Sequence, residues 1–418
     1  MGTKLMGNIT SQLNDLLSGN DLIKALSSLP CVCTNLNSKK DRLIALLDIY
    51  KIYIPNKASV EIYNTLYLSI LNSLEKKETI EEVELINSVG RNRSIKKYGV
   101  IGGLDSYRIT GLPGVGKSAT ISRIIDVICS GKVLANHRFK REIIPALVVE
   151  CPADGSFKSL LYSILQQIDL KLDSNYFALN SGKNITTDYL LNVVSIVLIN
   201  HVGVLIIDEI ERVANDSSRG ITLINYLTQL INQTNVGICF VGNEIANTYF
   251  AIKEYLGRRT VGVSVNHLEY DEFADFCEVL FDYQYTYKKL TLNNGFIQSF
   301  YKLTNGIPAL IVGLFVEAQK FAIINDISSI SVEIMDKILN SMFANMLPHL
   351  ENKKKNSVGK NKVKDDNILV FPKQRHNKES EEVIHDIFKI SYKDTDLFVN
   401  LLSKRIKVET IHESKNID

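Results

Sequence analysis

The 418-residue sequence predicts an α/β fold in which helices sandwich a parallel sheet. The prediction rests on three observations. Residues 96–268 alternate strand and helix patterns, as a doubly wound parallel sheet does. A glycine-rich loop at residues 111–118 joins a predicted strand to a predicted helix. An apolar run at residues 204–207 ends in two carboxylates, as expected of a buried strand that reaches a ligand site.

The glycine-rich loop reads Gly-Leu-Pro-Gly-Val-Gly-Lys-Ser, a complete G-x-x-x-x-G-K-[ST] phosphate-binding motif. Its glycines let backbone N–H groups point inward at a triphosphate, Lys117 would reach the β and γ phosphates, and the Ser118 hydroxyl would bind Mg²⁺. The strand pattern at 106–110 and the helical spacing at 119–128 supply the strand-loop-helix context, and the helix directs its positive end at the anion. We therefore predict that ATP binds here. The predicted binding residues are Gly111, Leu112, Pro113, Gly114, Val115, Gly116, Lys117, Ser118 and Ala119.

The apolar run at 204–207 is followed by Asp208 and Glu209. Asp208 at the strand tip can complete the Mg²⁺ shell with Ser118, and Glu209 can orient or deprotonate an attacking water. A poised water implies hydrolysis, whereas a small-molecule P-loop kinase would need a phosphate acceptor. Taken alone, the run could be an ordinary strand exit, but with the phosphate loop upstream it predicts an ATPase.

A third element ends at Asn243, after a helical pattern at 221–231 and a buried strand pattern at 236–242. Ligands of an open parallel sheet lie outside the carboxyl ends of its strands, so Asn243, Asp208 and the phosphate loop can converge. Asn243 could sense the γ phosphate or position water. The alternative is an asparagine that serves only a turn.

Residues 269–347 show helical patterns without a strand signal, so they predict a small lid. A phosphate-loop core followed by a helical lid is the arrangement of AAA+ proteins. Residues 352–378 contain nine Lys and Arg against two acids and predict a flexible basic linker, and 379–408 could dock a partner. The predicted regions are a helical N-terminal appendage at 1–95, the core at 96–268, the lid at 269–347, and the linker and docking tail at 348–418.

Composition sets limits on function. The net charge of +2 gives no global argument for nucleic acid, so any basic surface has to be local. The N-terminus lacks a basic segment followed by an apolar core, so we expect no signal peptide and a cytoplasmic protein. Cys31 and Cys33 are the one close cysteine pair in the sequence, without a second pair at zinc spacing, so we expect no metal other than Mg²⁺.

Several motifs occur together in one order along the chain. They are Gly90-Arg91-Asn92-Arg93, residues 111–118, residues 150–158, Asp208-Glu209 and Leu256-Gly257-Arg258-Arg259. In this combination the sequence resembles the TnsC/TniB ATPases, AAA+ regulators of bacterial transposons with heteromeric transposition machinery. The resemblance covers roughly residues 85–345, and its most specific part is the Cys-Pro-x-Asp-Gly-Ser-x-Lys strand exit at 151–158.

The resemblance implies a bacterial protein that binds ATP and oligomerises on double-stranded DNA as a ring or filament. It also implies transposase subunits and a target-selection protein as partners. Arg258 and Arg259 stand where AAA+ proteins place the arginine that reaches a neighbour's γ phosphate, although a solvated helix end is the alternative. Residues 305–310 offer no lid arginine, so the resemblance does not extend to lid sensing of ATP.

A basic insertion could track a DNA backbone without reading bases, and solvated surface charge is the alternative. A rival to the transposition hypothesis is an AAA+ or related signalling or defence ATPase that acts on a protein partner without DNA. The candidate DNA contacts are Lys132, His137, Arg138, Phe139, Lys140, Arg141 and Lys158.

Overall fold

The computed structural model describes residues 9–77, 106–244 except 138, 183, 216 and 235, and 260–342. All of the described residues belong to one compact unit. The predicted linker and docking tail at 348–418 lie outside the described residues, so both stay predictions.

Among the described residues, six strands form one sheet in the order β2-β3-β4-β5-β1-β6. All neighbouring strands pair in parallel except β2, which runs antiparallel to β3. The strands are β1 (Ser106–Gly111), β2 (Leu134–Asn136), β3 (Arg141–Glu150), β4 (Val202–Asp208), β5 (Gly237–Gly242) and β6 (Thr260–Val265). This sheet, with helices on both faces, confirms the predicted fold class.

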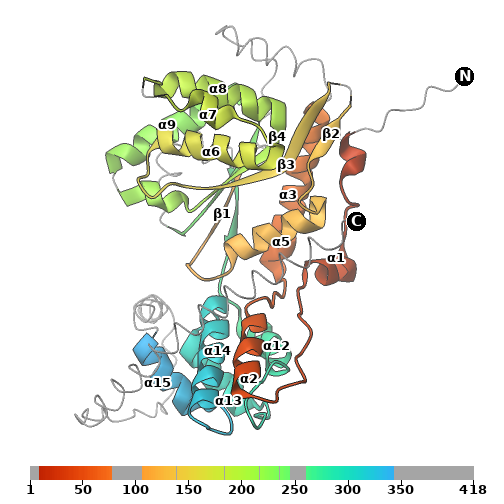
Figure 1. The fold of residues 1–418 in the computed structure, drawn as a ribbon, viewed down its shortest axis with the longest axis vertical. Helices are drawn as coiled ribbons and strands as arrows, with labels where there is room; N and C mark the ends of the chain where they lie inside the picture. The colour runs from red at the N-terminus through yellow and green to blue at the C-terminus, as the bar shows by residue number, and fades with distance from the viewer. Residues whose placement is uncertain are drawn as a thin grey trace, which may run out of the picture. The chain divides into compact units, whose positions relative to one another are not determined.

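Helices cover the two faces of the sheet (Figure 1). One face packs against α6, α8 and α9, and the other packs against α3 and α5. Strand β4 is buried along its whole length. Leu205 and Ile207 point into the first core, and Val204 and Ile206 point into the second, because successive side chains of a strand face opposite ways. The helices of this region are α5 (Lys117–Cys129), α6 (Phe157–Leu172), α7 (Tyr176–Asn180), α8 (Thr187–His201) and α9 (Ser217–Thr234).

The N-terminal helices are built into two different hydrophobic cores. Ile62, Leu66 and Ile70 of α3 pack into the core beneath the sheet, together with α1 and α5. Leu46 and Ile49 of α2 instead pack among the lid helices, where Figure 1 shows α2 beside α12 to α14. The chain therefore passes from the sheet to the lid and back before β1 begins. The elements are η1 (Ile9–Gln12), α1 (Gly19–Leu26), α2 (Lys39–Ile49) and α3 (Lys57–Lys76).

The lid contains four described helices, α12 (Tyr270–Phe281), α13 (Asn294–Thr304), α14 (Pro308–Ile324) and α15 (Val332–Met342). Phe273, Phe300 and Phe315 are fully buried at its centre, and the rings of Phe273 and Phe300 pack edge to face.

Within the described residues, no single helix is long and apolar enough to cross a membrane. Helices α13 and α14 have the required length and apolar composition only when they are taken together, and the pair is bent by 116°.

His201 at the end of α8 connects the helical layer to the sheet. Its Nδ1 lies 2.8 Å from the carbonyl oxygen of Glu142, and its Nε2 lies 3.0 Å from the hydroxyl of Tyr176. A carbonyl can only accept, so Nδ1 carries the proton and Nε2 accepts from the tyrosine in the neutral ring. Burial lowers the pKa of His201, so the folded protein favours this neutral form.

Candidate nucleotide-binding site

The phosphate loop turns from the carboxyl end of β1 into the N-terminus of α5. Gly114 and Gly116 have φ values of 79° and 91°, a region that side chains other than glycine rarely adopt. At Gly111 a Cβ would lie 2.2 Å from the carbonyl oxygen of Val265 in the neighbouring strand β6. The glycine spacing that the sequence analysis singled out is therefore required by the backbone at three positions.

Backbone carbonyl groups of the phosphate loop hold the side chain of Lys117 over the loop. The Nζ atom donates to the carbonyl oxygens of Gly111 and Leu112 at 2.9 and 3.0 Å. Burial lowers the pKa of the Lys117 ammonium, while the carboxylates of Glu211 and Asp208 act in the opposite direction. The structure thus places one cation at the point where the motif expects the β and γ phosphates.

Ser118 and Asp208, the two predicted Mg²⁺ ligands, are in direct contact across the site. The Ser118 hydroxyl donates to Oδ2 of Asp208 at 2.5 Å, and the backbone N–H of Glu209 donates to Oδ1 at 2.8 Å. Asp208 is buried, so both its oxygens are oriented by the protein. Two hard oxygen donors fit Mg²⁺, which takes one or two protein ligands and completes its shell with water and phosphate oxygens.

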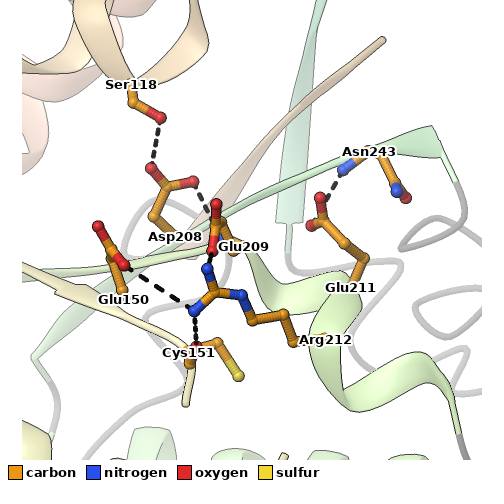
Figure 2. A network of polar contacts seen from close by, with 8 residues as sticks. All are labelled: Ser118, Glu150, Cys151, Asp208, Glu209, Glu211, Arg212 and Asn243. Carbon is orange, nitrogen blue, oxygen red and sulfur yellow. Dashed lines mark hydrogen bonds and ion pairs between the residues drawn. The ribbon is translucent and has the colours of Figure 1, made fainter. Parts of the chain in front are cut away.

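Glu209 follows directly in a left-handed backbone conformation, with φ of 56°. Its carboxylate forms an ion pair with the guanidinium of Arg212, one turn further along η2 (Ile210–Asn215). Arg212 also donates to the carbonyl oxygen of Cys151 at 2.8 Å and lies 3.9 Å from Oε2 of Glu150 (Figure 2). The sequence analysis did not identify Arg212; its spacing of three residues from Glu209 was the available signal.

Asn243 follows β5, which lies between β4 and β1 in the sheet. The carboxyl ends of these three strands therefore carry Asp208, Asn243 and the phosphate loop at one edge of the sheet. The backbone N–H of Asn243 donates to Oε2 of Glu211 at 3.2 Å (Figure 2). Glu211 is a second residue that sequence reasoning missed.

The strand exit after β3 is stiffened by its own polar residues. Asp154 accepts from the backbone N–H of Ser156 at 3.0 Å and from the hydroxyl of Ser159 at 2.7 Å, and these bonds lower the pKa of Asp154. Ser156 caps α6 by accepting from the N–H of Ser159. Cys151 donates its N–H to the Asp208 carbonyl at 2.8 Å, and burial raises the pKa of its thiol to about 12. The strand exit at 151–158 therefore joins the end of β3 to the acidic end of β4.

The lid reaches the phosphate loop through its backbone. The N–H of Ala309, in the first turn of α14, donates to the carbonyl oxygen of Gly114 at 3.0 Å. The preceding turn is anchored by the N–H of Leu268, which donates to the carbonyl of Gly306 at 2.8 Å. This contact involves no side chain, so no residue-type signal could have predicted it.

The structure separates the candidate DNA contacts into two groups. Lys132 is exposed in the loop between α5 and β2, and His137 and Lys140 are exposed in the turn between β2 and β3. Arg141 instead donates to Asn200 Oδ1 at 3.0 Å and lies over the ring of Phe139. Lys158 donates to the carbonyl of Ile185 at 2.6 Å, so it too makes an intramolecular contact.

Three of the predicted arginines and one predicted motif lie outside the described residues, namely Arg138, Arg258, Arg259 and the motif Gly90-Arg91-Asn92-Arg93. The assignment of an arginine that acts on a neighbouring subunit therefore stays a prediction.

One family model matches the part of the chain that contains this site. Residues 105–250 match the family described as "AAA domain", a span that includes the phosphate loop, Asp208, Glu209 and Asn243. The chain has the AAA+ P-loop NTPase fold and is an ATP-hydrolysing enzyme. The comparison with curated proteins found no match.

Several solved structures are similar to the chain. The ORC2 protein of Aeropyrum pernix is 13% identical with a TM-score of 0.40, over 62% of this chain and 67% of that one. The Walker-type ATPase paby2304 of Pyrococcus abyssi is 16% identical with a TM-score of 0.39, over 67% and 76%. A chain of Drosophila ORC bound to DNA is 12% identical with a TM-score of 0.42, over 81% and 73%.

Proposed function

We propose that this AAA+ ATPase regulates DNA transposition by assembling on duplex DNA in an ATP-dependent manner and recruiting or activating a transposase. The observation that carries the ATP-dependent part is the direct contact of Ser118 with Asp208, with Glu209 as the next residue. The transposition part rests on the resemblance of the strand exit at 151–158 to the TnsC/TniB ATPases.

In the proposed reaction, the N–H groups of the phosphate loop and the ammonium of Lys117 bind the β and γ phosphates. Ser118 and Asp208 would hold Mg²⁺, which when bound neutralises phosphate charge. Glu209 takes a proton from the attacking water, and Asn243 orients that water.

Two variants of the site should separate binding from hydrolysis. Lys117→Ala removes the ammonium held over the loop and should abolish ATP binding. Glu209→Gln should retain binding while turnover falls by about 10²- to 10⁴-fold, the usual contribution of a general base. Binding is measured with a fluorescent ATP analogue and turnover by phosphate release without an acceptor. Lys302→Ala, at an exposed lysine of the lid, is the matched control and should change neither. Equal loss of ATP binding in both site variants would contradict the role of Glu209.

The subunit arrangement is tested by mixing. If Arg258 or Arg259 completes the site of a neighbour, an alanine variant mixed with Lys117→Ala should recover hydrolysis, since each protein supplies what the other lacks. Assembly without recovery at every mixing ratio would exclude the trans arrangement.

DNA binding should depend on ATP, show little sequence preference and weaken with salt, because it rests on phosphate neutralisation. The exposed residues Lys132, before β2, and Lys140, between β2 and β3, are the strongest described candidates. Replacing both with alanine should reduce the slope of log K against log salt by about two. Lys302→Ala, an exposed lysine of the lid, is the control. An unchanged slope in the double variant would place the DNA path elsewhere.

A signalling or defence ATPase that acts on a protein partner is the second candidate function. It is favoured by one observation: Arg141 and Lys158, two of the basic residues proposed for DNA, already make contacts within the chain. If ATP-dependent oligomers form at the same protein concentration with and without duplex DNA, and DNA changes neither assembly nor hydrolysis, this second function replaces the first.

A further inference from the structure

Arg212 connects the predicted catalytic base to the strand that precedes it in the sheet. Its guanidinium pairs with the carboxylate of Glu209, donates to the Cys151 carbonyl at 2.8 Å, and lies 3.9 Å from Oε2 of Glu150 (Figure 2). The backbone N–H of Arg212 donates to the Glu209 carbonyl at 3.0 Å, so η2 keeps the guanidinium next to the Glu209 carboxylate.

The partners of Arg212 come from the ends of two paired strands. Glu150 of β3 is in register with Asp208 of β4, and the N–H of Cys151 donates to the Asp208 carbonyl. The guanidinium therefore spans the junction between the strand exit and the acidic pair. A planar fork suits this position, because it can donate to a carbonyl and a carboxylate at the same time.

The ion pair opposes the chemistry assigned to Glu209. A neighbouring positive charge stabilises the ionised carboxylate and so makes it a weaker base, and the bound guanidinium occupies oxygen lone pairs that a water would need. The contact is only partly shielded, since the side chains of Arg212 and Glu209 are 36% and 42% exposed. The side chain of Glu150 is 73% exposed, which leaves its carboxylate accessible as a second partner for the same guanidinium.

We propose that Arg212 is a positioning residue that restrains Glu209, and that the restraint is released when its guanidinium moves to Glu150. The inference rests on the proposed role of Glu209 as the base. It links the end of β3 to the ATPase site, because Arg212 donates to the Cys151 carbonyl and lies close to Glu150.

The test measures kcat and KM for ATP hydrolysis in the full chain, together with ATP affinity. Arg212→Ala should raise kcat about two- to fivefold, the effect of removing a partly exposed ion pair, with KM and ATP affinity unchanged. Glu150→Gln removes the alternative partner and should lower kcat by a similar factor. Arg212→Lys retains the charge without the fork, so its kcat should lie between those of the wild type and Arg212→Ala.

Further variants separate this inference from the proposed function. Glu209→Gln should lower hydrolysis by the same factor of about 10² to 10⁴ in both the wild-type and the Arg212→Ala backgrounds. If Glu209→Gln retains wild-type turnover, the assignment of the base fails. If Glu209→Gln loses turnover but Arg212→Ala lowers kcat or leaves it unchanged, the restraint itself is wrong. Arg212→Gln, which keeps a neutral donor for the Cys151 carbonyl, provides the same test if Arg212→Ala does not fold, and a raised kcat is again the expected result.

Discussion

Replacing Gly306 with alanine should weaken the turn that connects the lid to the phosphate loop. Gly306 has a φ of 70°, and a Cβ built on it would lie 2.2 Å from the carbonyl oxygen of Leu268. The obstacle is backbone, so it cannot rotate away as a side chain could. Three residues further on, Ala309 donates to the Gly114 carbonyl, so a shift of the turn reaches the nucleotide site.

The magnitude follows from two contributions. A residue other than glycine in the left-handed region costs about 1–2 kcal/mol. The hydrogen bond from Leu268 to Gly306 contributes about 0.5–1.5 kcal/mol and is strained when the two segments separate. We therefore expect Gly306→Ala to lower the free energy of unfolding by about 2–3 kcal/mol. Gly295→Ala is the matched control, because a Cβ there would meet only the side-chain oxygen of Asn293, at 3.3 Å. Its effect should stay within about 1 kcal/mol.

Urea unfolding gives the stability of both variants, and titration with a fluorescent ATP analogue gives their affinities. Gly306→Ala should lose both stability and ATP affinity, because the turn carries the contact between α14 and the phosphate loop. If Gly306→Ala is as stable as Gly295→Ala, the strain argument is refuted. Lost stability with unchanged ATP affinity would instead show that the Ala309 contact does not couple the lid to the nucleotide.

Other changes test separate parts of the structure. Ser118→Ala should lower phosphate release on the order of 100-fold while ATP still binds in EDTA, and equal activity with and without the hydroxyl would exclude Ser118 as a Mg²⁺ ligand. Burial lowers the pKa of His201 in the folded protein below its usual value of 6.5. As the pH falls, the unfolded chain therefore binds a proton at this histidine before the folded protein does. The contribution of neutral His201 to the free energy of unfolding is complete above pH 6.5 and is lost as the pH falls below that value. His201→Asn should therefore flatten the decline in urea stability between about pH 7.5 and 5.5, whereas an unchanged decline would assign it to other groups. Deletion of residues 352–418 should spare ATP hydrolysis and DNA assembly but lose transposase recruitment in a pull-down; equal recovery of transposase by both chains would exclude a docking role.

The sequence by itself determined the fold class and the order of the nucleotide motifs. The phosphate loop was readable because its requirement is local, since the positive φ of Gly114 and Gly116 admits few other residues. The strand at 204–207 was readable because a strand buried on both faces has to be apolar throughout, and β4 is. Asp208 and Asn243 could be placed at one edge because parallel strands present their carboxyl ends together.

Only the tertiary structure decided which segments pack against one another. Helical spacing shows that α2 and α3 each have an apolar face, yet it does not indicate that one covers the lid core and the other the sheet. Arg212 reaches the Cys151 carbonyl across 61 residues of sequence because β3 and β4 pair in one register. The contact of Ala309 with Gly114 joins two backbones, and backbone groups are the same in every residue but proline. Periodicity and motif chemistry identify which groups need a partner, and the pairing of distant segments decides which partner each group meets.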